Sequence, residues 1–314
     1  VRARQWSQQM LGIVDPNTDL RDRLPRIGTS IAPIGKLLSS VASELGLPPG
    51  IPVAPGGGDH MMGAIGTGNV KPGVVTMSLG TSGTIYSYAD ASVTDPNGDI
   101  AAFCSSTGGW LPLICTMNCT AGTQLMQDLF ATTISQFEAN LQISAHGAQG
   151  VIAVPFFNGE RTPNLPSGKA CLFGLDGQNM RQENILRATV EGVTFGLRAG
   201  LELLAKQGLT AQDIVLTGGG ANSPAWRQIV ADICNAPVQV FTNSEAAALG
   251  AALQALASLT GANIEKVAGE HLATAAHAYC LPQRDAADFY REHYQSYRQA
   301  TAHVQALYRE RRPA

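Results

Sequence analysis

Charged side chains are scarce in this sequence. Asp, Glu, Lys and Arg together make up 14% of the 314 residues, and the formal net charge is −3. A surface that binds nucleic acid or an anionic membrane needs clustered lysines and arginines. The one basic cluster, "RERRPA", lies at the end of the chain, at 309–314. We therefore expect neither a nucleic-acid partner nor a membrane partner.

The sequence also lacks long apolar runs and closely paired cysteines. No run reaches the roughly 18 apolar residues that span a bilayer, and the opening "VRARQWSQQMLG" has no signal-peptide pattern. The six cysteines form no C-x-x-C pair. This pattern favours reduced, buried thiols in a cytoplasmic protein, although disulfides or a zinc site stay open.

The first residue is valine, not methionine. The nearby residues Trp6, Met10, Leu11 and Ile13 have the character of a packed segment. We expect the chain to be a C-terminal piece of a longer protein.

What the sequence does contain is alternating helical and strand patterns. Apolar residues at helical spacing predict helices over 30–46, 120–130, 244–259 and the last thirty residues, and a long one along the stripe from Leu186 to Leu204. Short apolar runs predict strands at 51–55, 73–79, 84–89, 150–157, 213–217 and 238–241. Strands that alternate with helices in this way indicate an α/β fold with a parallel or mixed sheet covered by helices.

Three glycine-rich turns follow predicted strands: "GGGD" at 56–59, "GTSG" at 80–83 and "GGG" at 218–220. Glycine lets backbone N–H groups approach a ligand, and several that point one way form an anion-binding concavity. Ligands of open α/β sheets bind at the carboxyl ends of strands. The turns match neither the P-loop pattern GxxxxGK[ST] nor the dinucleotide pattern GxGxxG.

Each turn has a structural explanation that stays open. "GTSG" could serve merely to join two strands of a hairpin. "GGG" could serve merely as a tight connection between a strand and a helix whose N-cap is Ser223 and whose first residue is Pro224. Asp59 could be merely the N-cap of the helix that follows it.

Four blocks, in this order, resemble the FGGY family of carbohydrate kinases, and within it the xylulokinases most closely. "GLPPGIPVAPGGGD" is similar to the segment with the catalytic aspartate, and "SLGTSG" to the phosphate-binding hairpin. "FNGERTP" with "RATVEGVTFGLR", and then "TGGGANSPAWRQIVADI", are similar to later signatures. The resemblance runs from about residue 10 to the end.

The resemblance implies an actin-like ATPase (ribonuclease H-like) fold, with a mixed sheet flanked by helices and a cleft between two lobes. Residues 1–70 would be the C-terminal part of the first, sugar-binding lobe, and residues 71–314 the second, nucleotide-binding lobe. The first phosphate motif and most sugar contacts of the family are not found in this sequence. We therefore expect this chain alone to be inactive.

The resemblance also assigns site residues. Asp59 would be the general base at the sugar hydroxyl that attacks the γ-phosphate of ATP, and Asp59 and His60 would contact the sugar. The nucleotide, as ATP with Mg²⁺ and without a metal site made of protein side chains, would be bound by Gly80, Thr81 and Ser82 at the phosphates and by Gly218, Gly219, Gly220, Asn222, Ser223 and Gln124 around the adenosine. The "GERTP" loop would lie near the cleft or serve a purely structural role.

The implied activity is ATP-dependent phosphorylation of D-xylulose to D-xylulose 5-phosphate in the cytoplasm; a homodimer is the assembly considered, and the oligomeric state stays open. His60 departs from the family pattern, because many xylulokinases have Asn after the catalytic aspartate. Ribulose, gluconate or a polyol therefore stay open as substrates, and His60 could simply pack at the helix start. A non-kinase nucleotide-binding module of the actin kind and an inactive sensor also stay open; Asp59 and "GERTP" favour the kinase.

Overall fold

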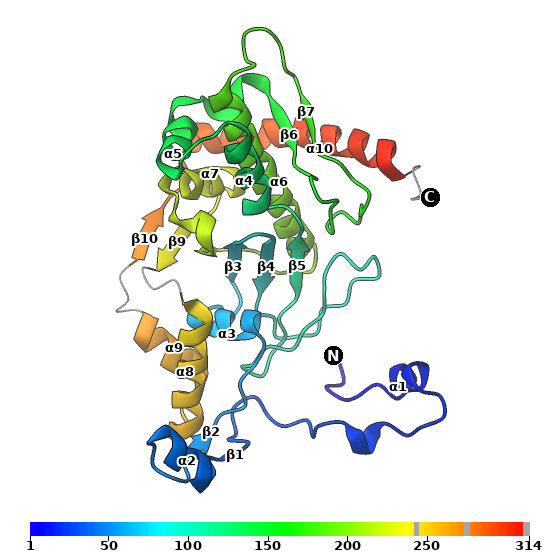
Figure 1. The fold of residues 1–314 in the computed structure, drawn as a ribbon, viewed down its shortest axis with the longest axis vertical. Coiled ribbons are helices and arrows are strands. Elements are labelled where there is room, and N and C mark those ends of the chain that lie inside the picture. The colour runs from blue at the N-terminus through cyan, green and yellow to red at the C-terminus, as the bar shows by residue number, and fades with distance from the viewer. Residues whose placement is uncertain (242–244, 273–276, 310–314) are drawn as a thin grey trace.

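The computed structural model describes residues 1–241, 245–272 and 277–309, and a mixed six-stranded sheet lies at its centre (Figure 1). The strands, in spatial order, are β10 (His277–Cys280), β9 (Val238–Phe241), β8 (Asp213–Thr217), β3 (Val74–Leu79), β4 (Gly83–Ser87) and β5 (Leu113–Thr116). Strands β3, β8 and β9 run parallel, and the outer pairings are antiparallel. The mixed sheet and the hairpin of β3 and β4 confirm the sequence predictions.

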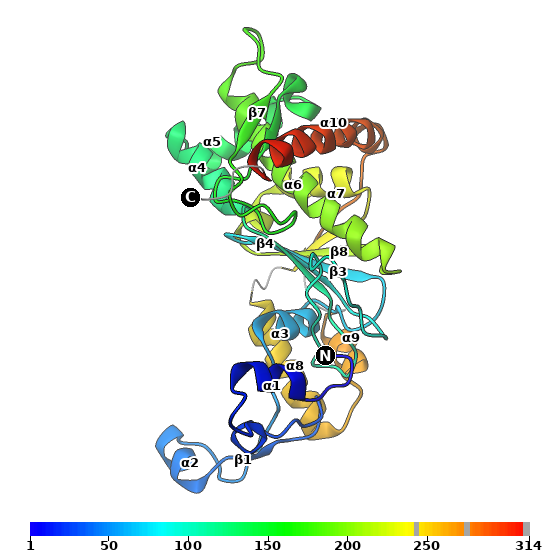
Figure 2. The same cartoon turned by 90° about the vertical axis from the view of Figure 1, so that its right-hand side faces the viewer.

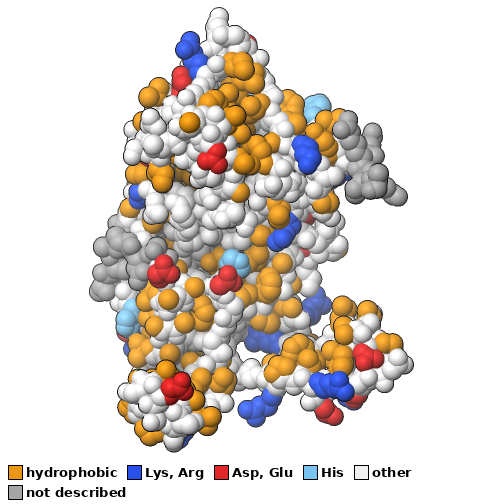
Figure 3. Space-filling view, in the orientation of Figure 1, with side chains coloured by type: hydrophobic (Ala, Val, Ile, Leu, Met, Phe, Trp, Pro, Cys, Tyr) orange, Lys and Arg blue, Asp and Glu red, His pale blue; other side chains and the backbone are white. Residues whose placement is uncertain are grey.

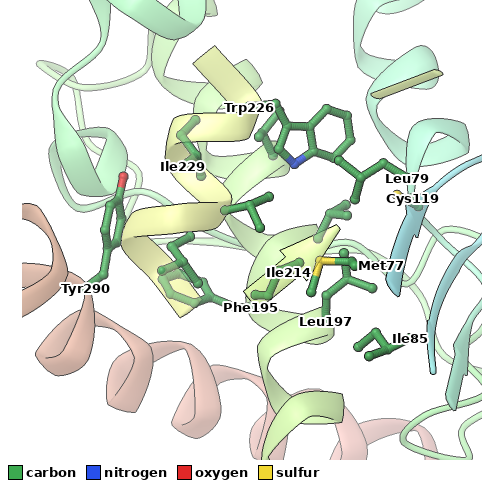
Figure 4. Close-up of a cluster of buried hydrophobic side chains, with 14 of the residues drawn as sticks. Met77, Leu79, Ile85, Cys119, Phe195, Leu197, Ile214, Trp226, Ile229 and Tyr290 are labelled. Carbon is green, nitrogen blue, oxygen red and sulfur yellow. The ribbon is translucent and has the colours of Figure 1, made fainter. Parts of the chain in front are cut away.

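One face of the sheet carries the main hydrophobic core. The helices on this side are α4 (Thr120–Leu129), α5 (Ile134–Ile143), α6 (Gln182–Lys206), α7 (Pro224–Cys234) and α10 (Arg284–Arg309). Met77, Leu79 and Ile85 of the sheet face Phe195 and Leu197 of α6 (Figure 4). Of the stripe that predicted the long helix, Leu186, Val190, Val193, Leu197 and Leu204 are buried and Leu201 is half-buried, because α6 lies between the sheet and α10.

The opposite face is covered by a smaller group of helices, namely α3 (Asp59–Gly66), α8 (Ala246–Thr260) and α9 (Ile264–Leu272), as Figure 2 shows from the side. Helices α3 and α8 approach closely at two glycines. A Cβ atom on Gly250 would lie 1.8 Å from the carbonyl oxygen of Met62, and one on Gly66 would lie 1.9 Å from that of Ala246. The small-residue helix predicted at 244–259 is confirmed from Ala246 on, while Ser244 lies outside the described residues.

The region around the glycine triplet also agrees with the sequence prediction. After β8 comes a short 3-10 turn, η3 (Gly219–Asn222), and then α7. Ser223 is the N-cap of α7, its hydroxyl accepts a hydrogen bond from the Trp226 N–H, and Pro224 is the first helical residue. Asn235, in the left-handed conformation, ends the helix.

Two other predictions hold with shorter or partial elements. The strand expected at 150–157 is reduced to β6 (Ile152–Val154), which follows the 3-10 segment η2 (His146–Gly150) and pairs with β7 (Cys171–Phe173). The C-terminal helix is confirmed as α10, with Tyr290, Tyr294 and Tyr297 buried. Residues 310–314, which hold most of the basic cluster, lie outside the described chain.

The N-terminal region differs sharply from the predictions. It consists of α1 (Gln8–Val14), η1 (Arg21–Arg23), β1 (Gly35–Lys36), α2 (Ser39–Leu45) and β2 (Pro52–Val53). Ala42 is its only buried residue up to position 58. The predicted packed segment is wrong, since Met10 is 58% and Ile13 is 68% exposed. The predicted helix over 30–46 is also wrong before Ser39, because nothing in the described chain covers its apolar side.

The surface shows the same contrast. In Figure 3 the N-terminal segment projects at the lower right with hydrophobic side chains on its outside.

All six cysteines are unpaired, as predicted, but only Cys119 is fully buried and the other five are half-buried. Within the described ranges, no helix combines the length and the apolar character that a membrane span requires.

Candidate functional site

The second and third glycine turns meet at one edge of the sheet. Strands β3 and β8 are parallel neighbours with Ser78 opposite Thr217, so the residues that follow both strands emerge side by side. Gly218 has a φ of +82°, and a Cβ atom there would lie 2.7 Å from the carbonyl carbon of Leu79 and 2.9 Å from the nitrogen of Gly80. Only glycine allows this contact between the two backbones.

In the "GTSG" turn the first two carbonyl groups accept hydrogen bonds, while the first three N–H groups are free. The N–H and the hydroxyl of Thr120 each donate to the carbonyl oxygen of Gly80 at 2.9 Å, and the N–H groups of Cys119 and Ala121 donate to that of Thr81 at 3.1 and 3.2 Å. Within the described chain, the N–H groups of residues 80–82 donate to no acceptor. Such a row of free N–H groups is suited to bind an anion such as a phosphate.

A cavity of about 660 Å³ adjoins the glycine triplet and is walled by α4 and α5. Among its lining residues are five of the six predicted to surround the adenosine: Gln124, Gly219, Gly220, Asn222 and Ser223. Phe137 and Trp226 supply apolar surface. The volume and the mixture of apolar walls with a few polar groups are typical of small-molecule sites.

Two side chains at this cavity are engaged within the protein. The Ser223 hydroxyl donates to the Glu138 carboxylate at 2.5 Å, and the same carboxylate accepts from the Ala225 N–H at 2.8 Å. Gln124 donates to Asp128 at 2.7 Å. Sequence reasoning missed Glu138, because no local pattern shows that α5 lies against the first turn of α7.

A second cavity, of about 210 Å³, is lined by Gly218 and Asn222, and Asn222 also lines the cavity of about 660 Å³. It is also lined by Thr67, at the end of α3, and by Arg227 of α7. The Nε–H of Arg227 is buried and has no hydrogen-bond partner among the described residues. The glycine triplet therefore borders two hollows, one of them next to a cationic side chain.

Asp59 begins α3, and the loop before it is held in place by α8. Gly58 is the N-cap, so the alternative that Asp59 caps the helix is wrong. The buried Gln254 side chain accepts from the Gly56 N–H at 2.9 Å and donates to the Ser30 carbonyl at 3.0 Å. A carboxylate in the first turn of a helix is stabilised by the partial positive charge there.

Asp59 and His60 lie over the middle of the sheet, beside Tyr86 of β4. The His60 and Tyr86 ring centroids are 5.3 Å apart, and burial together with the Asp59 charge raises the pKa of the Tyr86 hydroxyl. Asp59 is exposed and His60 half-buried. Neither residue lines either cavity. His60 packs on Tyr86 of β4, and this strand begins at Gly83, the last residue of the "GTSG" turn.

The comparisons with known proteins identify the class. The model of the C-terminal domain of the FGGY family of carbohydrate kinases matches residues 75–259, and that of the N-terminal domain matches residues 1–66. The chain belongs to this family, and its fold is the actin-like ATPase fold of the FGGY sugar kinases.

Several individual proteins of known name are similar to this chain in sequence or in structure. A xylulose kinase from Haemophilus influenzae is 43% identical over 253 residues, which are 81% of this chain and 51% of that protein. A crystal structure of a xyloylose kinase from Brucella ovis superimposes with a TM-score of 0.89 at 27% identity, over 98% of this chain and 62% of the other. A gluconate kinase from Lactobacillus acidophilus gives the same TM-score at 21% identity, with the same coverage. The chain spans about half the length of the curated relatives it matches.

Proposed function

We propose that the protein to which this chain belongs is an ATP-dependent sugar kinase. The observation that carries this proposal is the backbone contact between the "GTSG" and "GGG" turns. It sets free N–H groups at residues 80–82 beside a cavity of about 660 Å³ lined by Gly219 and Gly220. A triphosphate and a nucleoside need these two environments next to each other.

The reaction requires positioning and charge stabilisation rather than covalent catalysis. Gly80, Thr81 and Ser82 would hold the phosphates with their N–H groups. Asp59 would accept the proton of the sugar hydroxyl as it attacks the γ-phosphate. Asp59 is exposed at the start of α3, where a substrate can reach it.

Mg²⁺ would accompany the ATP and neutralise charge on its phosphates. The described residues contain no group of three or more His, Cys, Asp or Glu side chains arranged to hold a metal ion. The chain's own contribution at the phosphates would thus come from backbone N–H groups and the hydroxyls of Thr81 and Ser82.

D-xylulose is the substrate that we propose, with D-xylulose 5-phosphate as the product. The support is the 43% identity to a protein named xylulose kinase. His60, half-buried against Tyr86, leaves room for another sugar or polyol, since its ring nitrogens can also bind hydroxyl groups.

A substrate panel on the full-length protein tests this proposal. Pentuloses, hexonates and polyols are each incubated with MgATP while ADP release is followed. We expect the highest kcat/KM with D-xylulose; a clear preference for gluconate, ribulose or a polyol would reassign the substrate. ATP hydrolysis that no sugar changes would favour the non-kinase nucleotide-binding module instead.

A second incubation uses this chain by itself. We propose that residues 1–314 alone do not phosphorylate D-xylulose, because the first phosphate motif and most sugar contacts of the family are not found in them. Appreciable turnover by the isolated chain would contradict this.

A further inference from the structure

The "GERTP" loop contains a buried carboxylate with no cationic partner. Glu160 is 4% exposed, and no Lys, Arg or His in the described chain forms an ion pair with it. A buried charge is costly unless hydrogen bonds compensate for it. Consistent with this, burial raises the pKa of the Glu160 carboxyl group.

The compensating hydrogen bonds come mainly from the segment that joins β5 to α4. Oε1 of Glu160 accepts from the Met117 N–H at 2.6 Å and from the Arg161 N–H at 2.7 Å, and Oε2 accepts from Nδ2 of Asn118 at 3.2 Å. Thr162 adds a hydrogen bond from its hydroxyl to the Cys115 carbonyl, at 3.1 Å. The loop is therefore fastened to residues 115–118.

The segment that Glu160 binds also holds the "GTSG" turn, through the residues on either side of Met117 and Asn118. Immediately after Asn118, the N–H groups of Cys119 and Thr120 bind the carbonyl groups of Thr81 and Gly80. Thr116, just before Met117, binds Gly83 through its hydroxyl, which accepts from the Gly83 N–H at 3.2 Å. Both ends of the turn thus depend on where residues 116–120 lie.

We propose that Glu160 is a positioning residue for the nucleotide phosphates. By fixing Met117 and Asn118, its carboxylate sets the place of the α4 N-terminus. This in turn holds the carbonyl groups of the "GTSG" turn and leaves the N–H groups of residues 80–82 free. Glu160 itself touches neither ATP nor sugar, and this inference rests on the proposed nucleotide site.

A glutamine at position 160 tests the link with little change in size. Gln offers one acceptor and one NH₂ group, so an NH₂ group would face either Asn118 Nδ2 or the two N–H groups now bound by Oε1. Asn118 cannot turn over to compensate, because its Nδ2 also donates to the Gly159 carbonyl and its Oδ1 accepts from the Asn158 N–H.

Glu191 provides the matched control. It is 1% exposed and accepts from the Gly147 N–H, Arg187 and Tyr290, but it ties α6 to α10 and η2 and makes no hydrogen bond to residues 115–121. Glu191→Gln should therefore lower Tm without altering the phosphate turn.

The experiment measures ADP affinity by calorimetry and amide hydrogen exchange without nucleotide, in the full-length protein, below the Tm of every variant. Glu160→Gln should weaken ADP binding by about tenfold or more and speed exchange at 79–83 and 117–121. Glu191→Gln should leave ADP affinity within about twofold, a change worth less than half a kcal/mol. Thr162→Val, a milder change in the same loop, should give a smaller effect in the direction of Glu160→Gln.

Two results would overturn the positioning role: unchanged exchange at 79–83 in Glu160→Gln, or an equal loss of ADP affinity in Glu191→Gln. If Glu160→Gln does not fold, Thr162→Val decides by the same two measurements. A failure of the wild-type protein to bind ADP would instead refute the nucleotide site, and the exchange data would still show whether Glu160 fixes the turn.

Discussion

The same kind of periodic apolar pattern has different structural outcomes in residues 1–58 and in the body, the rest of the chain, which packs around the sheet. The stripe from Leu186 to Leu204 and the apolar positions between Ile34 and Leu45 both repeat every three or four residues. In the body, Leu197 is fully buried under the sheet, whereas in the N-terminal region Leu38 is 68% exposed and belongs to no core. Periodicity therefore predicts a helix reliably only where another layer covers its apolar side.

The first glycine turn lies where the two regions join. Residues 1–58 contact the body through a few side chains, such as Arg4, whose guanidinium lies 4.3 Å from the Trp110 ring centroid. Gln254 then fixes the loop that ends at Asp59. The proposed catalytic base thus stands on the packed side of this junction, at the start of α3.

The largest expected effect is on kcat, when a substitution at Asp59 is compared with one in the exposed region before it. Asp59→Asn should lower kcat of the full-length protein by about 10² to 10⁴-fold, because general-base catalysis is lost. Asp22→Asn, at an exposed position in η1, is the control and should leave kcat unchanged. Steady-state kinetics with MgATP and the best sugar decide this; equal activity of both variants would show that Asp59 is not the base.

A pair of leucine substitutions tests the contrast in packing directly. Leu197→Ala should reduce the free energy of unfolding by about 2–5 kcal/mol, since it opens a cavity in the core. Leu38→Ala should change it by no more than about 0.5 kcal/mol. Urea unfolding of both variants gives the two values, and a large loss for Leu38→Ala would mean that residues 1–58 are packed in solution.

The close approach of α3 and α8 should give a smaller but definite effect. Gly250→Ala places a methyl group against the Met62 carbonyl and should cost about 1–3 kcal/mol of stability. The control is Gly269→Ala in α9, where a Cβ atom would meet nothing within 4 Å; it should stabilise by up to about 1 kcal/mol through helix propensity. Equal unfolding midpoints for the two variants would place the α3–α8 contact in doubt.

The smallest effect concerns pH. The folded protein raises the pKa of Glu160 above its usual value of 4.5, so the folded state holds this proton to higher pH than the unfolded chain does. The resulting stability is complete below that usual value and is lost as the pH rises through the raised pKa. As the pH rises above 4.5, unfolding free energies should therefore fall more for the wild type than for Glu160→Gln. Parallel curves would contradict the raised pKa.

Much of the body could be predicted from sequence because its signals are local. Ser223 and Pro224 mark the start of α7, and Gly80 and Gly218 mark backbone turns at strand ends. The roles of Glu138 and Glu160 could not be predicted in this way, because each acts on a segment more than forty residues away. The sequence also could not predict that α8 and α9 pack against α3 rather than against the main core. This packing joins elements from both sides of the proposed boundary at residue 70.

The site residues proposed from sequence fall into two groups in space. The turns that contain Gly80 and Gly218 touch, and Gln124, Asn222 and Ser223 line the cavity beside them. Asp59 and His60 line neither cavity, and the His60 ring packs against Tyr86. The sequence motifs do not show this arrangement, since it depends on how α3 packs on the sheet.

Backbone amide NMR of the full-length protein, labelled with ¹⁵N-glycine and titrated with MgADP, tests most directly whether the two bends form one nucleotide site. We expect the signals of Gly80, Gly218 and Gly219 to shift together with one dissociation constant, while that of Gly269 in α9 stays in place. Shifts that spare both bends, or that follow different dissociation constants at Gly80 and Gly218, would contradict it.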